Sequence, residues 1–322
     1  MLNRNKIAKV DYLDFISEDL EKRTKFIKDF GDSFANMGFA LVANHGVTIE
    51  ARDELFDVAI RFFDLPQADK VKYEDVSNGG QRGYISKNRE SAKGKDVPDL
   101  KEFYHIGQEV RDGDSIKAEY ADNIWPKEIA GFEDTTLTVY QTFEKTGRNL
   151  LRAIALYLNL DENYFDDKIH NGNSVLRLLH YYPLENVEDV PDGAVRAAAH
   201  GDINLITLLM GANAGGLQAQ TLDGEWLDIN PEPNEIVINI GDMLARLTND
   251  KLRSTIHQVV NPTDKELLKK PRYSTPFFLH PRSDMDLSCL ESCVDSTRSK
   301  KYPNVSAGEF LQERLLELGL KK

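Results

Sequence analysis

The stretch AHGDINL, residues 199–205, decides how the rest of the sequence is interpreted. His200 and Asp202 are two residues apart, and in an extended chain such residues point to the same side. One imidazole and one carboxylate can therefore meet at a common point. A third ligand is expected from STIHQVVNP, residues 254–262, where His257 is a polar residue within a strand pattern.

Two histidines and one carboxylate, with the remaining positions open, form the facial triad that holds Fe(II) in non-haem oxygenases. Three protein ligands leave three positions, which a bidentate organic acid and O₂ can occupy. An H-x-D pair alone is weak evidence, because a histidine in a strand is more often a satisfied polar residue. The pattern becomes more specific only when it is combined with the next polar stretch.

That stretch is PRYSTP, residues 271–276, in which Arg272 and Ser274 again share one face of a strand. A buried arginine is costly unless it meets an anion. The planar guanidinium fits a carboxylate, and a serine hydroxyl adds a further hydrogen bond. The sequence therefore predicts an anion clamp near a metal triad.

Composition limits the classes of protein that fit. The chain has 322 residues, which allows two domains or one large domain, and its net charge is 40 − 53 = −13. Because no basic patch offsets this charge, we expect no nucleic-acid partner. We find no apolar run long enough for a membrane span and no signal-peptide pattern. With only Cys289 and Cys293 as cysteines, we expect a cytoplasmic protein without membrane association.

The spacing of apolar residues predicts an α+β fold. Helices are expected after Ser17, over residues 48–63 and 134–158, and from a capping box at Ser306. Short apolar runs separated by Gly, Pro, Asn and Asp fill residues 174–281, which indicates an antiparallel sandwich or barrel. The expected strands are 39–42, 175–179, 205–210, 216–219, 236–240, 255–260 and 273–279.

The chain divides into a helix-rich region, residues 1–120, that packs on a core, residues 121–322; one continuous domain is the alternative. Residues 77–101 are expected to form a long surface loop. Its cations either attract an anionic substrate or form a solvated charged surface; they are Arg82, Lys87, Arg89, Lys93 and Lys95.

Taken in order, these stretches closely resemble the isopenicillin N synthase-like subgroup of the Fe(II)- and 2-oxoglutarate-dependent oxygenases. Further similar segments are GF (38–39), NHGV (44–47), LP (65–66), GGLQ (215–218), DGEW (223–226) and NIGD (239–242). The resemblance covers roughly residues 10–285. It implies a double-stranded β-helix, or jelly roll, supported by N-terminal helices and followed by a C-terminal helix.

The resemblance also implies roles for individual residues. His200, Asp202 and His257 match the iron ligands, and Arg272 and Ser274 match the residues that grip the distal carboxylate of 2-oxoglutarate. Tyr182 matches a tyrosine that commonly joins this site. His180 replaces the asparagine of many relatives, so it either donates a hydrogen bond near the metal or packs structurally.

The implied reaction consumes 2-oxoglutarate and O₂ and oxidises an unactivated C–H bond of a small molecule, most simply by hydroxylation, with release of succinate and CO₂. Ascorbate could serve as a reductant in vitro. No side chain is needed as a catalytic acid or base. Candidate substrate contacts, with core packing as the alternative for each, are Phe278, Leu178, Tyr84, Phe103 and Tyr104, the last three as parts of a lid.

Other readings of the same residues remain open at this point. Desaturation and ring closure are branches of the same chemistry. Some relatives are oxidases that use Fe(II) and O₂ without 2-oxoglutarate, and there Arg272 and Ser274 would hold the substrate's own carboxylate. An ethylene-forming type and a non-catalytic jelly-roll metal-binding protein are further alternatives.

Overall fold

The computed structural model describes residues 6–75, 77, 79–87, 89, 100–110, 112–184, 195–211, 215–262 and 264–317. The strands are β1 (Ala8–Asp11), β2 (Phe39–Ala43), β3 (Gly83–Ile85), β4 (Glu102–Gly107), β5 (Val175–Tyr181), β6 (Ala197–His200), β7 (Ile206–Gly211), β8 (Leu217–Gln220), β9 (Trp226–Asp228), β10 (Glu235–Ile240), β11 (His257–Val259) and β12 (Arg272–Leu279). The α-helices are α1 (Tyr12–Ile16), α2 (Leu20–Asn36), α3 (Ile49–Phe63), α4 (Gln67–Lys70), α5 (Phe132–Tyr157), α6 (Asp166–Ile169), α7 (Asp242–Leu247) and α8 (Ala307–Glu317). Short 3₁₀ helices are η1 (Val71–Tyr73), η3 (Ser115–Glu119), η5 (Lys265–Leu267) and η6 (Glu291–Cys293).

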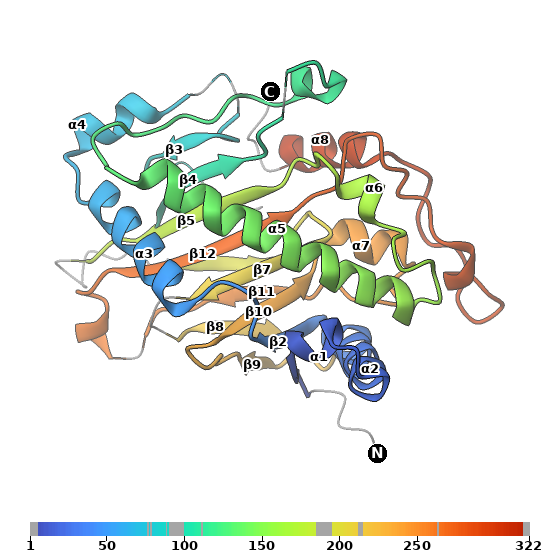
Figure 1. Ribbon diagram of the computed structural model, residues 1–322. Helices are drawn as coiled ribbons and strands as arrows, with labels where there is room; N and C mark the ends of the chain where they lie inside the picture. Colours follow the sequence, from blue (N-terminus) through green and yellow to red (C-terminus); the bar gives the residue numbers. More distant parts are fainter. Residues whose placement is uncertain are drawn as a thin grey trace.

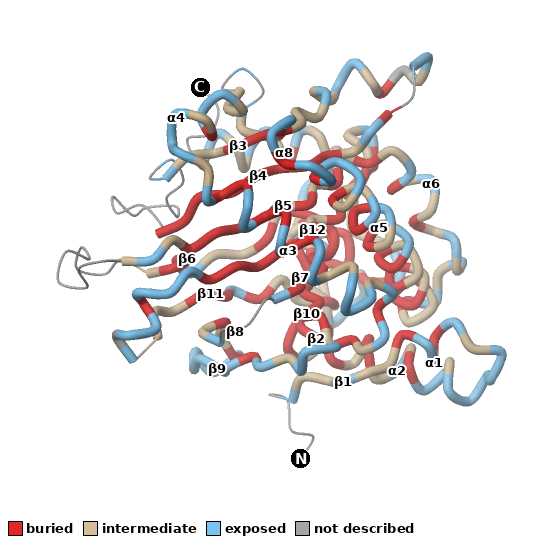
Figure 2. Tube along the Cα trace, turned by 60° about the vertical axis from the view of Figure 1, so that its left-hand side comes forward, coloured by how far each residue is buried: buried red, intermediate tan, exposed pale blue. Residues whose placement is uncertain are grey.

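The described strands form two sheets, as in a jelly roll. The large sheet has the order β1-β2-β10-β7-β12-β5-β4-β3, and the small sheet has the order β6-β11-β8-β9. Buried side chains of both sheets form a layer that we call the inner cluster. Its members are Phe39, Leu41, Phe103, Leu179, Tyr181, Ala197, Leu217, Ala219, Ile229, Val237 and Val259. Figure 2 shows buried stretches in red along strands such as β4 and β5. The predicted α+β class and jelly-roll core are confirmed.

Helices cover the other face of the large sheet. Figure 1 shows α5 running across this face, with α3 beside it. The buried residues between sheet and helices form an outer cluster, which includes Phe62, Phe143, Leu178, Leu208 and Phe277. Successive strand residues therefore alternate between the two clusters, and an odd or even position decides whether a side chain faces the jelly-roll interior.

Side-chain caps mark the start of several helices, whereas α4, α5, α6 and α7 have none. Thr48 caps α3 through its hydroxyl, which accepts from the Ala51 N–H, and Ser306 and Glu309 form the predicted capping box of α8. The predicted cap at Ser17 is wrong by two residues. Asp19 caps α2 instead, because its carboxylate accepts from two backbone N–H groups of the first turn.

The range expected to be a surface loop, residues 77–101, contains a strand, β3, and part of this range lies outside the described residues. β3 pairs with β4, which begins just after this range and in turn pairs with β5, so β3 forms an edge of the large sheet. Arg82 is completely buried, because its guanidinium packs where a Cβ on Gly107 would otherwise lie. Sequence patterns miss β3 because three residues carry no periodicity and the pairing partner supplies its stability. Lys93 and Lys95 lie outside the described residues.

The N-terminal segment contributes to the same sheet as the core. Val42 of β2 is paired with Ile236 of β10, and β4 is paired with β5. Among the described residues, no helix combines the length and the apolar character needed to cross a membrane. A division of the chain at residue 120 stays a prediction.

Gly147 lies where α5 approaches the large sheet. The sequence alone makes it a tolerated flaw in a helix, but the structure gives it a packing role. A Cβ at this position would lie 2.3 Å from Leu279 Cδ1 and 3.4 Å from Leu208 Cδ1. The missing side chain therefore allows close contact between helix and strands.

We expect Gly147→Leu to lower the free energy of unfolding by about 1–3 kcal/mol, because the added carbons enter a filled core. Urea denaturation measures the change. Lys145→Leu, at an exposed position of the same helix, is the matched control and should change stability by about 0.5 kcal/mol or less. Equal effects of the two variants would contradict the packing role of Gly147.

Candidate active site

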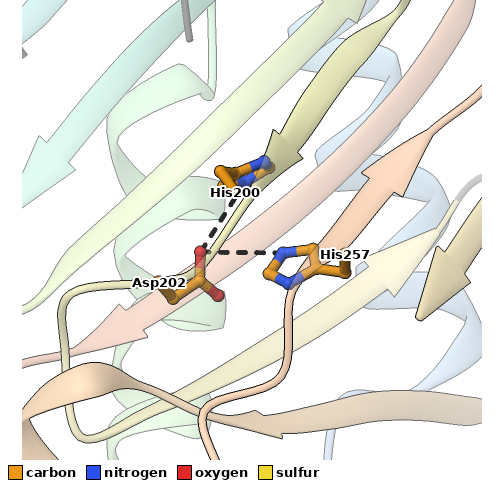
Figure 3. Close-up of side chains that lie close together, drawn as sticks. All are labelled: His200, Asp202 and His257. Carbon is orange, nitrogen blue, oxygen red and sulfur yellow. Dashed lines mark ion pairs between the residues drawn. The ribbon is translucent and has the colours of Figure 1, made fainter. Parts of the chain in front are cut away.

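Three side chains from two segments of the chain meet inside the jelly roll (Figure 3). His200 Nε2 lies 3.9 Å and His257 Nε2 lies 3.8 Å from Asp202 Oδ1. All three candidate ligand atoms lie within 4.8 Å of one another. The cross-strand pairing of His257 with His200 brings the two imidazoles together, and Asp202 follows β6 directly. Among the described residues this is the group that could hold a metal ion.

Backbone contacts orient both imidazoles. His200 Nδ1 lies 2.7 Å from the Ala198 carbonyl, and His257 Nδ1 lies 3.1 Å from the Thr255 carbonyl. A carbonyl only accepts, so in each ring Nδ1 carries the proton and Nε2 keeps its lone pair. Both Nε2 atoms are therefore prepared to bind a metal.

The Asp202 carboxylate is oriented in the same way by side chains of the large sheet. Thr207 Oγ1 and Asn239 Nδ2 donate to its Oδ2 at 2.6 and 2.8 Å, which leaves Oδ1 directed at the imidazoles. Burial opposes ionisation of Asp202, but the two imidazoles and these hydrogen bonds outweigh it and hold its pKa below the usual value. The carboxylate is therefore ionised at neutral pH, as a metal ligand must be.

Backbone hydrogen bonds join the segment that carries Asp202 to the start of α7. The Asp242 N–H donates to the Asp202 carbonyl at 2.7 Å, and the Gly241 N–H donates to Leu205. A Cβ on Gly241 would lie 2.1 Å from the Asn204 carbonyl oxygen, so only glycine permits this approach. The segment NIGD thus supports the site twice, through Asn239 and through Gly241.

The turn between α2 and β2 supports His257 from the other side. Thr255 Oγ1 donates to the Met37 carbonyl at 2.8 Å, and the Phe39 ring meets the His257 imidazole edge to face at 5.7 Å. Gly38 has φ +70°, and a Cβ there would lie 2.3 Å from the Arg253 carbonyl oxygen. The N-terminal pair Gly38-Phe39 therefore fixes the loop that delivers His257.

Arg272 and Ser274 share the inner face of β12, as the i, i+2 rule predicts. Both are buried, and the Arg272 guanidinium lies 4.9 Å from the ring centre of Tyr181, its cross-strand partner. Tyr181 belongs to the inner cluster. The neighbouring Tyr182, which the family pattern indicates, instead lies under the Lys87 ammonium at 4.2 Å. Tyr181 is the aromatic contact of Arg272.

His180 belongs to a buried polar network on the outer face of the sheet. Its Nδ1 donates to Glu102 Oε1 at 2.8 Å, and its ring stacks on Tyr273. Lys70 Nζ donates to Glu102 Oε2 at 2.8 Å, and the Tyr84 hydroxyl also donates to Glu102. The structure therefore does not bring His180 to the triad.

The candidate substrate contacts separate between the two layers. Leu178, Tyr84 and Tyr104 are buried in the outer cluster, so Tyr84 and Tyr104 are core residues rather than parts of a lid. The i, i+2 rule places Leu178 with His180 correctly, but their shared face is the outer one. Phe103 lies in the inner cluster. Phe278 is partly exposed and faces the interior beside Arg177, whose guanidinium lies 5.1 Å from its ring centre.

Sequence reasoning missed Tyr181, Thr207 and Arg177. Thr207 lies within an apolar run, and its bond to Asp202 depends on the pairing of β7 with β10. Once Arg272 is known to pair with Tyr181 on β5, alternation along β5 identifies Tyr181 and Arg177 as inward-facing residues. That register is set by tertiary structure.

The comparisons with known proteins agree with this geometry. A family model described as the N-terminal region of non-haem dioxygenase in morphine synthesis matches residues 9–128, and the 2OG-Fe(II) oxygenase superfamily model matches residues 172–281. A proline hydroxylase of Petromyces alliaceus is 31% identical over 323 residues, covering 97% of this chain and 99% of that protein. The chain belongs to the 2OG-Fe(II) oxygenase superfamily.

Solved structures of other members have the same fold. A 2OG-Fe(II) oxygenase family protein of Caulobacter crescentus is 45% identical, with a TM-score of 0.87 and coverage of 97% of this chain and 98% of that chain. A Neurospora crassa protein crystallised with α-ketoglutarate and thymine is 31% identical, with a TM-score of 0.86 and coverage of 96% of both chains. The protein is thus a dioxygenase that depends on Fe(II) and 2-oxoglutarate.

The residues present in this oxygenase fit iron. Imidazole nitrogen and carboxylate oxygen are donors that suit Fe(II), and a set of two histidines and one carboxylate leaves positions open for other ligands. The His200 side chain is 41% exposed, whereas those of Asp202 and His257 are 7% and 10% exposed. The site is therefore accessible from the side of His200 and closed by protein on the others.

The buried polar network around Glu102 predicts how the stability of the fold depends on pH. Hydrogen bonds from His180, Lys70 and Tyr84 outweigh the effect of burial and lower the pKa of Glu102 to about 2. The ionised carboxylate thus stabilises the fold above its ordinary pKa of 4.5, and this contribution is lost as the pH falls towards 2.

We expect Glu102→Gln to lower the free energy of unfolding by about 3–5 kcal/mol at pH 7, because the Lys70 ammonium stays buried without a counter-charge. The double variant Lys70→Met, Glu102→Leu should recover most of this loss. Asp29→Asn, which removes an exposed ion pair with Lys25, is the control and should cost about 1 kcal/mol or less. Denaturant unfolding that shows no difference between Glu102→Gln and the control would refute the role of the network.

Proposed function

We propose that this oxygenase hydroxylates an unactivated C–H bond of a small molecule, with His200, Asp202 and His257 as the iron ligands. The observation that carries the proposal is the pairing of this triad with Arg272 and Ser274 on the inner face of the same jelly roll. A metal-binding scaffold without catalysis has no use for a buried arginine and serine beside an open metal site.

The iron and 2-oxoglutarate together supply the oxidising power, and the co-substrate leaves as succinate and CO₂. The chain itself binds and orients. Arg272 and Ser274 hold the distal carboxylate of 2-oxoglutarate, while Tyr181 covers the guanidinium and excludes water from this ion pair. Thr207 and Asn239 keep the Asp202 carboxylate in place throughout.

The size and kind of substrate follow from the relatives and the charge of the chain. The Neurospora crassa relative was crystallised with thymine, and the Petromyces alliaceus relative is a proline hydroxylase. Both names indicate small polar ring compounds. The net charge of −13 argues against nucleic acid as the partner. A cytoplasmic location stays the prediction made from the sequence.

The first test concerns iron. We expect His257→Ala to lose stoichiometric Fe(II), because only two protein ligands remain and the open side of the site cannot replace the third. Anaerobic titration followed by metal analysis measures retention. His170→Ala is the control, since His170 is exposed and lies outside the group that could bind a metal. Iron retained as tightly by His257→Ala as by the parent would show that the ligand assignment is wrong.

The second test concerns 2-oxoglutarate. We expect Arg272→Leu to raise its Kd by at least about 100-fold, the scale of losing one partner of a buried charge pair. Calorimetry on the Fe(II)-loaded protein without O₂ gives the Kd, and Arg61→Leu, an exposed arginine of α3 paired with Asp57, is the control. An unchanged Kd would reject the clamp. A parent that neither binds 2-oxoglutarate nor forms succinate from it would point to an oxidase.

A further inference from the structure

A second buried arginine, Arg196, lies beside the clamp but comes from the other sheet. It directly precedes β6 of the small sheet and is only 5% exposed. Its guanidinium lies 6.0 Å from the ring centre of Tyr181, and that of Arg272 lies 4.9 Å from the same ring. Tyr181 and Arg272 belong to the large sheet. Two cations from different sheets therefore lie near one aromatic ring.

The protein does little to compensate the charge of Arg196. Its Nη2 donates to the Leu267 carbonyl at 3.4 Å, which is a long hydrogen bond. Among the described residues, no aspartate or glutamate lies within the 4.0 Å of an ion pair with this guanidinium. Burial lowers the pKa of Arg196, and the charge of Arg272 lowers it further. Because arginine stays protonated in proteins, a positive charge remains buried near a second one.

A structural role accounts for only part of this arrangement. The bond to Leu267 joins Arg196 to η5, shortly before β12 begins, and a neutral side-chain amide could donate the same bond. A single carbonyl dipole does not offset a full buried charge, which is costly unless an anion meets it. The hydrogen bond therefore explains the position of Arg196 but not its charge.

A carboxylate bound at this end of the interior would interact favourably with both arginines. Without an anion the two positive charges repel each other, whereas one negative charge attracts both. Solvent screens such forces poorly in a buried site, so they act over several ångströms. A ligand whose end is apolar gains nothing from the two cations.

We propose that Arg196 is a specificity-determining residue for the co-substrate. Its charge acts beside Arg272 from the other sheet, and it favours 2-oxo acids that carry a distal carboxylate over 2-oxo acids with an apolar distal end. Arg272 and Ser274 make the direct contacts, and Arg196 strengthens the attraction from across the Tyr181 ring. This inference rests on the proposed function, in which Arg272 and Ser274 hold the distal carboxylate of 2-oxoglutarate.

The test compares two 2-oxo acids that differ only at the distal end. 2-Oxoglutarate carries a carboxylate there, whereas 2-oxopentanoate carries a methyl group in its place. The full-length protein is loaded with Fe(II) without O₂, and calorimetry or ligand-observed NMR gives both Kd values without any turnover. The measured quantity is the Kd of 2-oxopentanoate divided by that of 2-oxoglutarate, which we call the selectivity ratio.

We expect Arg196→Gln to lower the selectivity ratio by at least about 5-fold, because glutamine keeps a donor for the Leu267 carbonyl but removes the charge. Nearly all of this change should be a higher Kd for 2-oxoglutarate. Arg196→Met is a second neutral variant and should give the same result, whereas Arg196→Lys keeps the charge and should retain most of the parent ratio. Thermal melts identify the folded variants, and one folded neutral variant is sufficient.

Arg246 is the matched control, because it also donates to a backbone carbonyl, that of Pro303, and lies 5.1 Å from the ring centre of Tyr302. Arg246→Met should leave the selectivity ratio unchanged. Equal losses of affinity for both acids in folded Arg196→Gln would indicate a purely structural role and would overturn the proposal. An unchanged ratio in that variant would overturn it as well.

The clamp variant distinguishes this inference from the proposed function. If Arg272→Leu abolishes the preference for 2-oxoglutarate while the neutral Arg196 variants keep it, the inference about Arg196 fails and the clamp stands. If the parent binds neither acid, or if Arg272→Leu keeps the parent ratio, the clamp of the proposed function itself fails.

Discussion

The structure depends on a buried carboxylate that stays ionised. Asp202 is taken out of water, which by itself favours its neutral form. Two imidazoles on one side and the hydroxyl of Thr207 with the amide of Asn239 on the other reverse that preference. These partners come from β7, β10, β11 and the end of β6, so the carboxylate can be held only when both sheets are assembled.

The rest of the fold positions the groups that contact Asp202. The two histidines lie on the small sheet, and the hydrogen-bond donors that orient the aspartate lie on the large sheet. The helices contribute from outside: the end of α2 holds the His257 loop through Thr255, and the start of α7 holds the segment that follows Asp202. The N-terminal region is thereby part of the structure of the site.

Charged groups are separated by the large sheet. On the outer face, Lys70, Glu102 and His180 neutralise one another in a closed network under α3 and α4. On the inner face, Arg272 lies against the ring of Tyr181, and Arg177 lies against the ring of Phe103.

The sequence by itself indicated the β-rich core from its short apolar runs, and it indicated the metal ligands from H-x-D and from a polar residue in a later strand. It predicted the Arg272–Ser274 clamp from R-x-S. It also indicated where α3 and α8 begin, because a capping side chain marks each start. The tertiary structure decided which face of a strand is the interior. That choice placed Leu178 and Tyr84 in the outer layer, and it brought Thr207 to Asp202 and Tyr181 to Arg272. Alternation separates two faces of a strand, but only the packing of a second sheet or a helix against one face makes it the inside.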